Sequence, residues 1–368
     1  MIIGIPKEIK AQENRIAATP AGVASFVKAG HKVIVQKDGG IGSGFSNEEY
    51  ISTGAEIVDS AKEVYDRSNL IYKVKEPLEP EYDLLREDHI IFTYLHLAPD
   101  LSQTEALLKS KCTAIAYETV QLDNGSLPLL APMSEIAGKM AVQVGAGLLQ
   151  KINGGSGVLL GGIPGVAPGR VVILGGGIAG TAATRVAYGM GAIVTVLDLS
   201  SDRMTYLQDI FPGVITIMST PHAIATAVRD ADLLIGAVLV AGDKAPKLVT
   251  EEMVKTMNTG SVIVDISIDQ GGTVETIDKT TSHKEPFYEK HSILHYSVPN
   301  IPGAVPRTST YALSNATLPY ALEIANKGVI QAMKENSALF KGLSVYKGNI
   351  ACKAVAEAQG RKYVPVLL

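Results

Sequence analysis

The chain has 368 residues, of which 46% are hydrophobic and 19% are charged, and its formal net charge at pH 7 is −4. The apolar content excludes an intrinsically disordered chain, and the slight acidic excess excludes a broad positively charged surface for nucleic acid. The length predicts two or three domains. Glycine is frequent, with 36 residues, and part of it is clustered between Gly154 and Gly191.

The chain carries no pattern of a secreted or membrane protein. Its start, MIIGIPKEIK, has no basic segment, no long apolar segment and no small-residue cleavage site. Residues 152–169 are uncharged and long enough to cross a bilayer, but they are rich in Gly and Pro, which disfavour a membrane helix. Cys112 and Cys352 lie far apart and form neither a disulfide framework nor a zinc spacing. We therefore expect a soluble cytoplasmic protein without a metal cluster.

Short β-branched apolar runs alternate with helical segments, which is the pattern of parallel α/β folds. In the first part of the chain, Thr19 and Pro20 predict the start of a helix that reaches about Lys28 and ends before Gly30. Ser102 predicts the cap of a later helix. The strands expected here are residues 2–5, 32–36, 70–74, 89–95 and 113–116.

A long helix is predicted over residues 133–152, starting at Ser134 and Glu135, and such a helix could link two domains. A second α/β series begins after the Gly- and Pro-rich segment and closes with a helix predicted over residues 314–327. The strands expected in this series are residues 171–174, 193–197, 214–218, 233–235 and 262–265. The sequence therefore predicts two α/β domains.

The segment RVVILGGGIAGTAATRVAYGMGAIVTVLDLS contains the pattern G-x-G-x-x-G at Gly175, Gly177 and Gly180. These glycines permit a tight turn, a close approach of a pyrophosphate and close helix–strand contact, and the following helix N-terminus attracts phosphate. Asp198 ends the next strand, where it can accept hydrogen bonds from a ribose and repel a 2′-phosphate, which favours NAD over NADP. Arg203 weakens this preference. A structural turn that binds no ligand is the alternative.

Four polar residues lie in loops that follow predicted strands: Arg15, Lys75, His96 and Asp269. Ligands of open parallel sheets bind outside the carboxyl ends of the strands, so these side chains are expected at that edge. Taken singly, such a residue is more often a solvated charge than a functional group. Their shared position makes them candidates.

The chemistry of the four candidates is coherent. Arg15 can bind a carboxylate through two hydrogen bonds, and Lys75 can polarise a carbonyl oxygen. An imidazole such as that of His96 suits proton transfer, and the Asp269 carboxylate can orient water or ammonia. With NAD as hydride acceptor, this set predicts oxidation at a carbon that bears a carboxylate.

Segments along almost the whole chain resemble the alanine dehydrogenase and transhydrogenase family. In the family's order, they are GIPKEIKAQENRIAATP, YKVKEP, TYLHLA, MSEIAGKMAVQ, LGGGIAG, GAVLVAGDKAPKLV, DISIDQGG and NIPGAVPRTSTYALSNATLPY. The resemblance implies a reversible reaction in which L-alanine, NAD and water give pyruvate, ammonium and NADH.

The resemblance also implies roles for single residues. Arg15 would bind the substrate carboxylate, and Lys75 would hold a carboxylate or carbonyl oxygen. His96 would be the acid–base group, and Asp269 would assist the attack of water on the iminium and the breakdown of the carbinolamine. Thr220 stands where the family has a serine. The residues implied to contact NAD are Ser134, Gly175, Gly177, Ile178, Ala179, Gly180, Asp198, Arg203, Thr220, Leu239, Val240, Ile266, Ser267, Ile268, Asp269, Val298, Pro299, Asn300 and Ile301.

The domain map that the resemblance implies has two Rossmann-like α/β domains with parallel sheets. The NAD domain, residues 129–305, is inserted into a discontinuous substrate domain, residues 1–128 and 306–368, and helices near residues 129–150 and 306–328 connect the two. The family is typically homohexameric, so a homo-oligomer is expected.

Two alternatives to an alanine dehydrogenase stay open at this point. One is the soluble NAD-binding subunit of a proton-translocating transhydrogenase, which has no amino-acid substrate and lacks the imidazole that His96 supplies here. The other is a related dehydrogenase of a larger amino acid or an opine, because the size of a substrate pocket cannot be deduced from one sequence.

Overall fold

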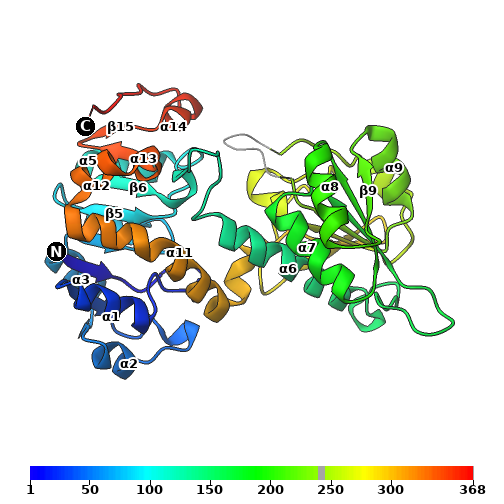
Figure 1. The fold of residues 1–368 in the computed structure, drawn as a ribbon, viewed down its shortest axis with the longest axis horizontal. Helices are drawn as coiled ribbons and strands as arrows, with labels where there is room; N and C mark the ends of the chain where they lie inside the picture. Colours follow the sequence, from blue (N-terminus) through cyan, green and yellow to red (C-terminus); the bar gives the residue numbers. More distant parts are fainter. Residues whose placement is uncertain (239–244, 368) are drawn as a thin grey trace. The chain divides into compact units, whose positions relative to one another are not determined.

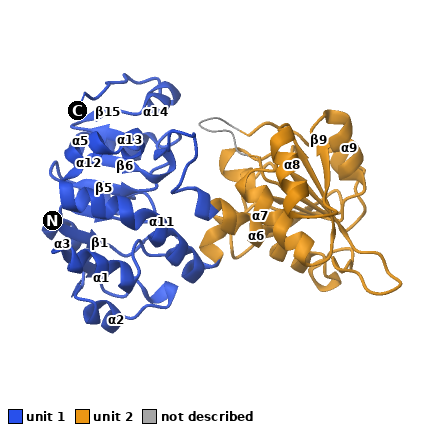
Figure 2. Ribbon diagram, in the orientation of Figure 1, with its two compact units in different colours: residues 1–133, 305–368 blue, residues 134–304 orange. Residues whose placement is uncertain are grey.

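The computed structural model describes residues 1–238 and 245–367. The chain forms two compact units (Figure 2): unit 1 comprises residues 1–133 and 305–368, and unit 2 comprises residues 134–304. The sequence-based map placed the corresponding boundaries after residues 128 and 305. No helix among the described residues is long and apolar enough to span a membrane.

Unit 1 contains a mixed β-sheet with helices along it (Figure 1). Its strands are β1 (Ile2–Ile5), β2 (Lys32–Gln36), β3 (Glu56–Val58), β4 (Leu70–Tyr72), β5 (Ile90–Thr93), β6 (Thr113–Ala116), β14 (Leu343–Tyr346) and β15 (Asn349–Ile350). Its helices are α1 (Pro20–Lys28), α2 (Asn47–Ser52), α3 (Ala61–Arg67), α4 (Glu79–Tyr82), α5 (Leu101–Ser110), α11 (Pro306–Lys327), α12 (Val329–Glu335), α13 (Ser337–Lys341) and α14 (Lys353–Ala358), with short 3-10 turns η1 (Ile41–Ser43) and η2 (Tyr117–Thr119).

Unit 2 contains a second mixed sheet (Figure 1). Its strands are β7 (Arg170–Leu174), β8 (Ile193–Asp198), β9 (Ile215–Met218), β10 (Leu233–Gly236), β11 (Val262–Asp265), β12 (Phe287–Lys290) and β13 (Ile293–Tyr296). The α-helices are α6 (Ala131–Leu148), which begins at the end of the first segment of unit 1, α7 (Ile178–Gly189), α8 (Ser201–Ile210), α9 (Pro221–Arg229) and α10 (Glu251–Lys255), and the 3-10 turns are η3 (Lys151–Asn153), η4 (Ile266–Gln270) and η5 (Ile301–Ala304).

Each sheet has a point where the strand order reverses. The order is β15-β14-β6-β5-β4-β1-β2-β3 in unit 1 and β12-β13-β11-β10-β7-β8-β9 in unit 2. The chain therefore builds outward in one direction from β1 or β7 and then returns to build in the other from β4 or β10. In open α/β sheets, the loops at the carboxyl ends of the strands beside such a reversal diverge, and ligands bind in the crevice between them.

The parallel sheets expected from the sequence are confirmed for the central strands but not for one edge of each sheet. In unit 1, β14 pairs antiparallel with both β6 and β15, and in unit 2, β12 pairs antiparallel with β13. The segments that form these edge strands were not predicted from the sequence, because they are short and lie outside the alternating pattern.

Unit 2 has three layers. Alternate residues of β7 face opposite sides of the sheet: Val171 and Ile173 pack with residues of α6, α7 and α8, whereas Val172 and Leu174 pack with residues of α9 and α10. A strand buried on both faces is apolar at consecutive positions rather than alternating, which is the pattern seen in RVVIL.

Local sequence patterns misplaced the boundaries of three helices. Asp100, not Ser102, caps α5, because its carboxylate accepts the Gln103 N–H at 2.9 Å. Helix α6 runs over Ala131–Leu148 instead of residues 133–152, so Ser134 lies within it. The local pattern placed the start of helix α11 at residue 314, eight residues too late, whereas the start near residue 306 that the family resemblance implies agrees with Pro306.

The early start of α11 has a tertiary cause. Its first turns are polar in sequence, but Thr310 is buried and its hydroxyl accepts the backbone N–H of Ile16 at 3.2 Å. The Ser43 hydroxyl lies 2.8 Å from the same oxygen. Contacts with distant segments therefore stabilise a helical stretch that its own apolar pattern does not mark.

Candidate functional site

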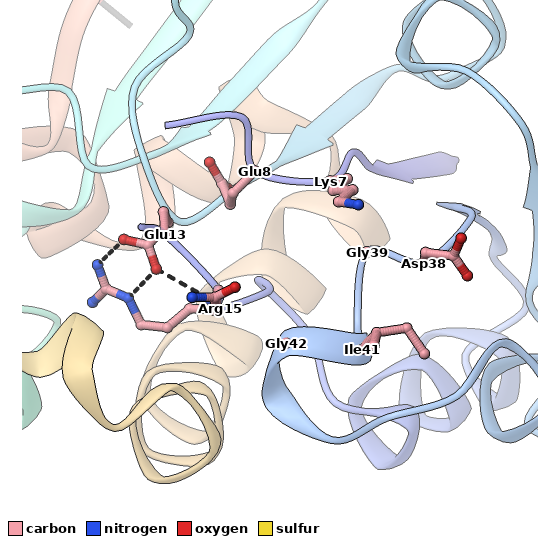
Figure 3. Close-up of a pocket in the computed structure, with 9 residues that line it drawn as sticks. Lys7, Glu8, Glu13, Arg15, Asp38, Gly39, Ile41 and Gly42 are labelled. Atoms are coloured by element: carbon pink, nitrogen blue, oxygen red, sulfur yellow. Dashed lines mark hydrogen bonds and ion pairs between the residues drawn. The ribbon is translucent and has the colours of Figure 1, made fainter. Parts of the chain in front are cut away.

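The first candidate site lies at the carboxyl edge of the sheet in unit 1. The loops that follow the neighbouring strands β1 and β4 carry Arg15 and Lys75. A cavity of about 520 Å³ opens beside the β1 loop (Figure 3). It is lined by Lys7, Glu8, Glu13, Asn14, Arg15, Asp38, Gly39, Ile41 and Gly42.

Arg15 is buried, and its guanidinium forms a bidentate ion pair with Glu13 (Figure 3). Nε donates to Oε1 at 2.7 Å, Nη2 donates to Oε2 at 2.5 Å, and Nη1 donates to the Met133 Sδ at 3.2 Å. Burial alone would raise the pKa of Glu13, but the hydrogen bonds from Arg15 outweigh it and lower this pKa to about 2. The pair directs the Nη1–Nη2 edge, whose geometry matches a carboxylate, away from Glu13.

Lys75 is buried in the loop after β4. Its backbone N–H donates to Oε1 of Glu8 at 3.3 Å, and its carbonyl accepts the Thr93 hydroxyl at 2.8 Å. Burial lowers the pKa of Lys75, and the nearby charge of Arg15 lowers it further. This ammonium group therefore loses its proton more readily than one on an exposed lysine.

A network of buried charges beneath this loop was not predicted from the sequence. The Lys73 Nζ lies 2.8 Å from Oε1 of Glu81 and 3.4 Å from Oε2 of Glu8. The other oxygen of Glu8 accepts the Val74 N–H at 2.7 Å in addition to the Lys75 N–H. The network ties the β4 loop to the β1 loop. In the sequence, Lys73 is the first lysine of YKVKEP, and nothing there distinguishes it from an ordinary surface lysine.

His96 follows β5, the next strand along from β4, and its side chain is exposed. Its backbone has φ of 49°, in the left-handed region. The imidazole stacks on the ring of Tyr94, with ring centroids 5.8 Å apart and 13° between the planes. The Tyr94 hydroxyl is held by a 2.6 Å hydrogen bond to the Leu129 carbonyl.

The structure brings three of the four sequence candidates to one edge of unit 1. Arg15 is close enough to Lys75 to lower its pKa. Tyr94 interacts with both Arg15 and His96. Burial raises the pKa of the Tyr94 hydroxyl, and the charge of Arg15 opposes that rise. The Tyr94 ring stacks on the His96 imidazole. The fourth candidate, Asp269, belongs to unit 2.

The second candidate site is the glycine loop after β7. Gly175 has φ of 97°, and a Cβ there would lie 2.8 Å from the Ala237 carbonyl oxygen. A Cβ on Gly180 would overlap the Gly175 carbonyl, whereas a Cβ on Gly177 would meet no atom within 4 Å. Gly175 and Gly180 are thus required for local folding, and Gly177 leaves open space at the N-terminus of α7. This geometry fits a pyrophosphate.

Asp198 and Arg203 both form hydrogen bonds with Gly176, in the middle of this loop. Oδ2 of Asp198 accepts the Gly176 N–H at 2.5 Å. Arg203 donates to the Gly176 carbonyl from Nε at 3.0 Å and from Nη2 at 2.8 Å, and Nη2 also donates to the Thr181 hydroxyl at 2.8 Å. The guanidinium is therefore engaged with the loop itself.

Two further predicted cofactor residues lie on helices of unit 2. A Cβ on Gly138 of α6 would overlap the Ala179 carbonyl, so α6 closely approaches the start of α7. Ser134 lies one turn before Gly138, on the same face of α6. Thr220 follows β9 and caps α9, with its hydroxyl accepting the Ala223 N–H at 3.2 Å.

The turn after β11 contains the predicted residues 266–269. Asp269 is exposed on η4, while Ser267 is buried and donates its hydroxyl to the Val238 carbonyl at 2.6 Å. The turn is organised by Asp265, which was not a candidate: Oδ1 accepts the Ser267 N–H at 2.9 Å and Oδ2 accepts the Thr273 N–H at 2.6 Å. Burial raises the pKa of Asp265.

The predicted residues 298–301 follow β13. Val298 and Ile301 are buried, and Asn300 has φ of 59°, with its carbonyl accepting the Gly303 N–H at 2.8 Å. The predicted contacts Leu239 and Val240 lie outside the described residues.

Two family models match the chain. The model described as "Alanine dehydrogenase/PNT, N-terminal domain" matches residues 4–137, and the model described as "Alanine dehydrogenase/PNT, C-terminal domain" matches residues 141–353. Together they extend over most of the sequence.

Relatives and solved structures agree with these models. An alanine dehydrogenase of Methanococcus maripaludis is 60% identical over 366 residues, which is 99% of this chain and 98% of the relative, and one of Bacillus subtilis is 56% identical over 99% and 96%. A solved L-alanine dehydrogenase superposes with a TM-score of 0.95 at 51% identity, covering 98% of this chain and 99% of its own. A solved transhydrogenase from Sinorhizobium meliloti superposes with a TM-score of 0.82 at 21% identity, covering 96% of this chain and 100% of its own. At this identity, the likeness shows the fold alone.

Proposed function

The chain belongs to the alanine dehydrogenase/PNT family, and we propose that it is an NAD-dependent L-alanine dehydrogenase. The reaction is L-alanine, NAD⁺ and water to pyruvate, ammonium, NADH and a proton, and it is reversible. One observation in the structure carries the substrate assignment: two buried cations, Arg15 and Lys75, meet at the strand-order reversal of unit 1, beside the strand that leads to His96.

Arg15 and Lys75 suit the carboxylate end of a 2-amino or 2-keto acid. Glu13 occupies the Nε–Nη2 edge of Arg15, so the substrate carboxylate binds at the Nη1–Nη2 edge, next to the weak acceptor Met133 Sδ. Lys75 donates to an oxygen of the substrate. This hydrogen bond strengthens as the oxygen gains charge during the interconversion of carbinolamine and ketone.

His96 and Asp269 are the proposed acid–base groups. His96 takes a proton from the substrate nitrogen so that the Cα–H bond can break, and returns a proton to nitrogen when ammonium leaves. The exposure of the imidazole in unit 1 lets it exchange that proton with solvent. Asp269 of unit 2 is assigned to the addition of water to the iminium.

The residues of the glycine loop fit a dinucleotide. The open space at Gly177 and the N-terminus of α7 would receive the pyrophosphate, and the Asp198 carboxylate at the end of β8 would receive the adenosine ribose. When bound, NAD supplies the acceptor for the hydride from Cα. Ser134, Thr220 and residues 266–269 and 298–301 are the further proposed contacts.

The assay that tests this function follows NADH formation with alanine, serine, glycine or lysine as the substrate. We expect alanine to give the highest kcat/KM, and pyruvate with ammonium to drive the reverse reaction. If alanine gave no NADH, while the protein supported hydride exchange between NADH and a thio-NAD analogue in the presence of a membrane partner, the transhydrogenase alternative would replace this proposal.

Replacing Asp198 tests the cofactor preference. Asp198→Ala removes the negative charge that would meet a 2′-phosphate, so the ratio of kcat/KM with NAD to that with NADP should fall by about tenfold or more. The same change removes the acceptor of the Gly176 N–H, so KM for NAD should also rise. Asp202→Ala, which alters an exposed carboxylate of α8, is the matched control. An unchanged ratio in Asp198→Ala would contradict the assignment.

We also expect a cytoplasmic homo-oligomer, and a hexamer in particular, because the family it resembles is typically hexameric. Gel filtration coupled to light scattering measures the molar mass of the purified protein in solution. A monomer of the 38.8 kDa chain would contradict the expectation.

A further inference from the structure

We propose that Glu118 is a positioning residue for His96. Its carboxylate fixes the backbone from which the imidazole projects. The inference rests on the proposed function, because it concerns the acid–base role of His96 in that reaction. Glu118 was not among the candidates from the sequence, where it is one of many acidic residues.

The position of Glu118 follows from the register of the sheet. β5 and β6 are parallel, and Thr93 of β5 pairs with Ala116 of β6. Both strands end at this pair, and continuing the register by two residues brings Leu95 beside Glu118 of η2. Beyond Thr93, the backbone that leads to His96 therefore has no ladder hydrogen bonds to β6.

The Glu118 side chain takes the place of that missing strand. Its two carboxylate oxygens each lie 3.2 Å from the Leu95 N–H nitrogen, and Oε1 accepts the His96 N–H at 2.6 Å. Hydrogen bonds from backbone N–H groups to a carboxylate are shorter and stronger than those to a neutral acceptor. Two consecutive backbone groups are therefore held by one anion.

The conformation that this anion holds is an uncommon one. His96 has φ of 49°, a left-handed backbone that residues other than glycine adopt only when their surroundings impose it. Left-handed His96 turns its ring back over Tyr94, with 13° between the ring planes. Tyr94 is itself buried and hydrogen-bonded to Leu129, so it is a fixed base for the imidazole. The imidazole is thus stacked on a fixed ring, while the His96 residue remains exposed.

An ordinary salt bridge does not explain Glu118. In the part of the chain that the structure describes, no Lys, Arg or His nitrogen lies within 4.0 Å of its carboxylate. Its carboxylate accepts hydrogen bonds from the backbone N–H groups of Leu95 and His96. The structure therefore connects this side chain to the histidine rather than to another element of unit 1.

The test is a double-mutant cycle on the full-length protein. Glu118→Ala should lower kcat for L-alanine by about 10- to 100-fold, because a misplaced acid–base group loses the alignment that proton transfer needs. KM for alanine and the Kd for NADH should change by less than about threefold, since Arg15, Lys75 and the unit 2 residues are untouched. Glu118→Gln keeps one acceptor oxygen and should recover part of the lost kcat.

The decisive measurement is Glu118→Ala in the His96→Ala background. If Glu118 acts through the imidazole, the double variant should turn over as fast as His96→Ala alone. Equal fold-losses in the two backgrounds would overturn the positioning role while leaving the function of His96 intact. Normal turnover of His96→Ala would overturn the acid–base role and this proposal with it.

Two controls separate positioning from loss of structure. Glu105→Ala removes an exposed carboxylate of α5 that pairs with Arg361, and it should leave kcat unchanged. If Glu118→Ala does not fold, Glu118→Gln carries the cycle instead. A loss of kcat in Glu118→Gln that is equally large in the His96 and His96→Ala backgrounds would likewise overturn the proposal.

Discussion

His96→Ala should lower the turnover of L-alanine by about 10²- to 10⁴-fold, the usual contribution of a positioned general acid or base. Binding of NADH should survive, because the residues proposed to bind it lie in unit 2 and His96 lies in unit 1. Turnover is followed by NADH absorbance and binding by the fluorescence of NADH on titration with protein. The exposed ring makes few stabilising contacts beyond its stacking on Tyr94, so the variant should fold normally.

A matched histidine variant makes the His96 result interpretable. His31 belongs to the same unit, but it precedes β2 and so lies at the amino edge of the sheet, away from the site. His31→Ala should retain normal turnover. If His96→Ala kept the turnover of the unmodified enzyme while still binding NADH, the acid–base assignment would be wrong.

Arg15→Met should lower both activity and stability, because it removes the proposed carboxylate anchor and the guanidinium that pairs with the buried Glu13 carboxylate. We expect kcat/KM for alanine to fall by at least about 100-fold, since charge-assisted bidentate bonds are among the strongest single contacts to a ligand. The free energy of unfolding should fall by about 3–5 kcal/mol, as for other buried ion pairs that lose one member. Urea denaturation at neutral pH measures the second effect.

The Arg15–Glu13 pair also predicts a pH dependence of stability. The pKa of Glu13 falls from 4.5 to about 2 on folding, so its carboxylate stabilises the folded state above pH 4.5. This contribution should be lost as the pH falls from about 5 to about 2. In Arg15→Met the carboxyl loses the guanidinium that lowers its pKa, so the variant should lose less stability than the unmodified protein as the pH falls through this range.

Two variants check the Arg15 result. Arg361→Met breaks an exposed ion pair with Glu105 and should cost at most about 1 kcal/mol. In the double variant Arg15→Met with Glu13→Gln, the buried charge is absent, so part of the lost stability should return while alanine binding stays weak. Unfolding curves of Arg15→Met that match those of the unmodified protein at both pH 7 and pH 3 would be incompatible with this account.

Elements with strong local signals were predictable. The first strand and α1, with its Thr19 cap and Pro20 at the first helical position, agree with the structure residue by residue. The strand–glycine loop–helix unit at Gly175–Gly180 was also predictable, because the positive φ of Gly175 and the close approach of Gly180 to the Gly175 carbonyl arise within a few residues of chain. Hydrophobic periodicity and helix caps depend on residues that are close together in the chain, so they can be deduced from a single sequence.

Features that depend on distant segments were not predictable from local patterns. The N-terminal turns of α11 are helical because Thr310 contacts the backbone of Ile16, and the edge strands β14 and β15 were missed. The reversal of strand order between β1 and β4 brings Arg15 and Lys75 together although a long stretch of sequence separates them. Strand order depends on how whole helices pack on a sheet, so it cannot be deduced from any short segment of the sequence.

The candidate site divides in the same way. Residue types, their places after strands and the family motifs were enough to select Arg15, Lys75 and His96, because the chemistry of a side chain is written in the residue itself. The partners of these residues came from the folded chain: Glu13 on the guanidinium, Glu8 under the Lys75 loop and Glu118 on the His96 backbone. An acidic residue has the same letter whether it is solvated or buried against a cation or a backbone amide, and tertiary contacts determine which of these it is.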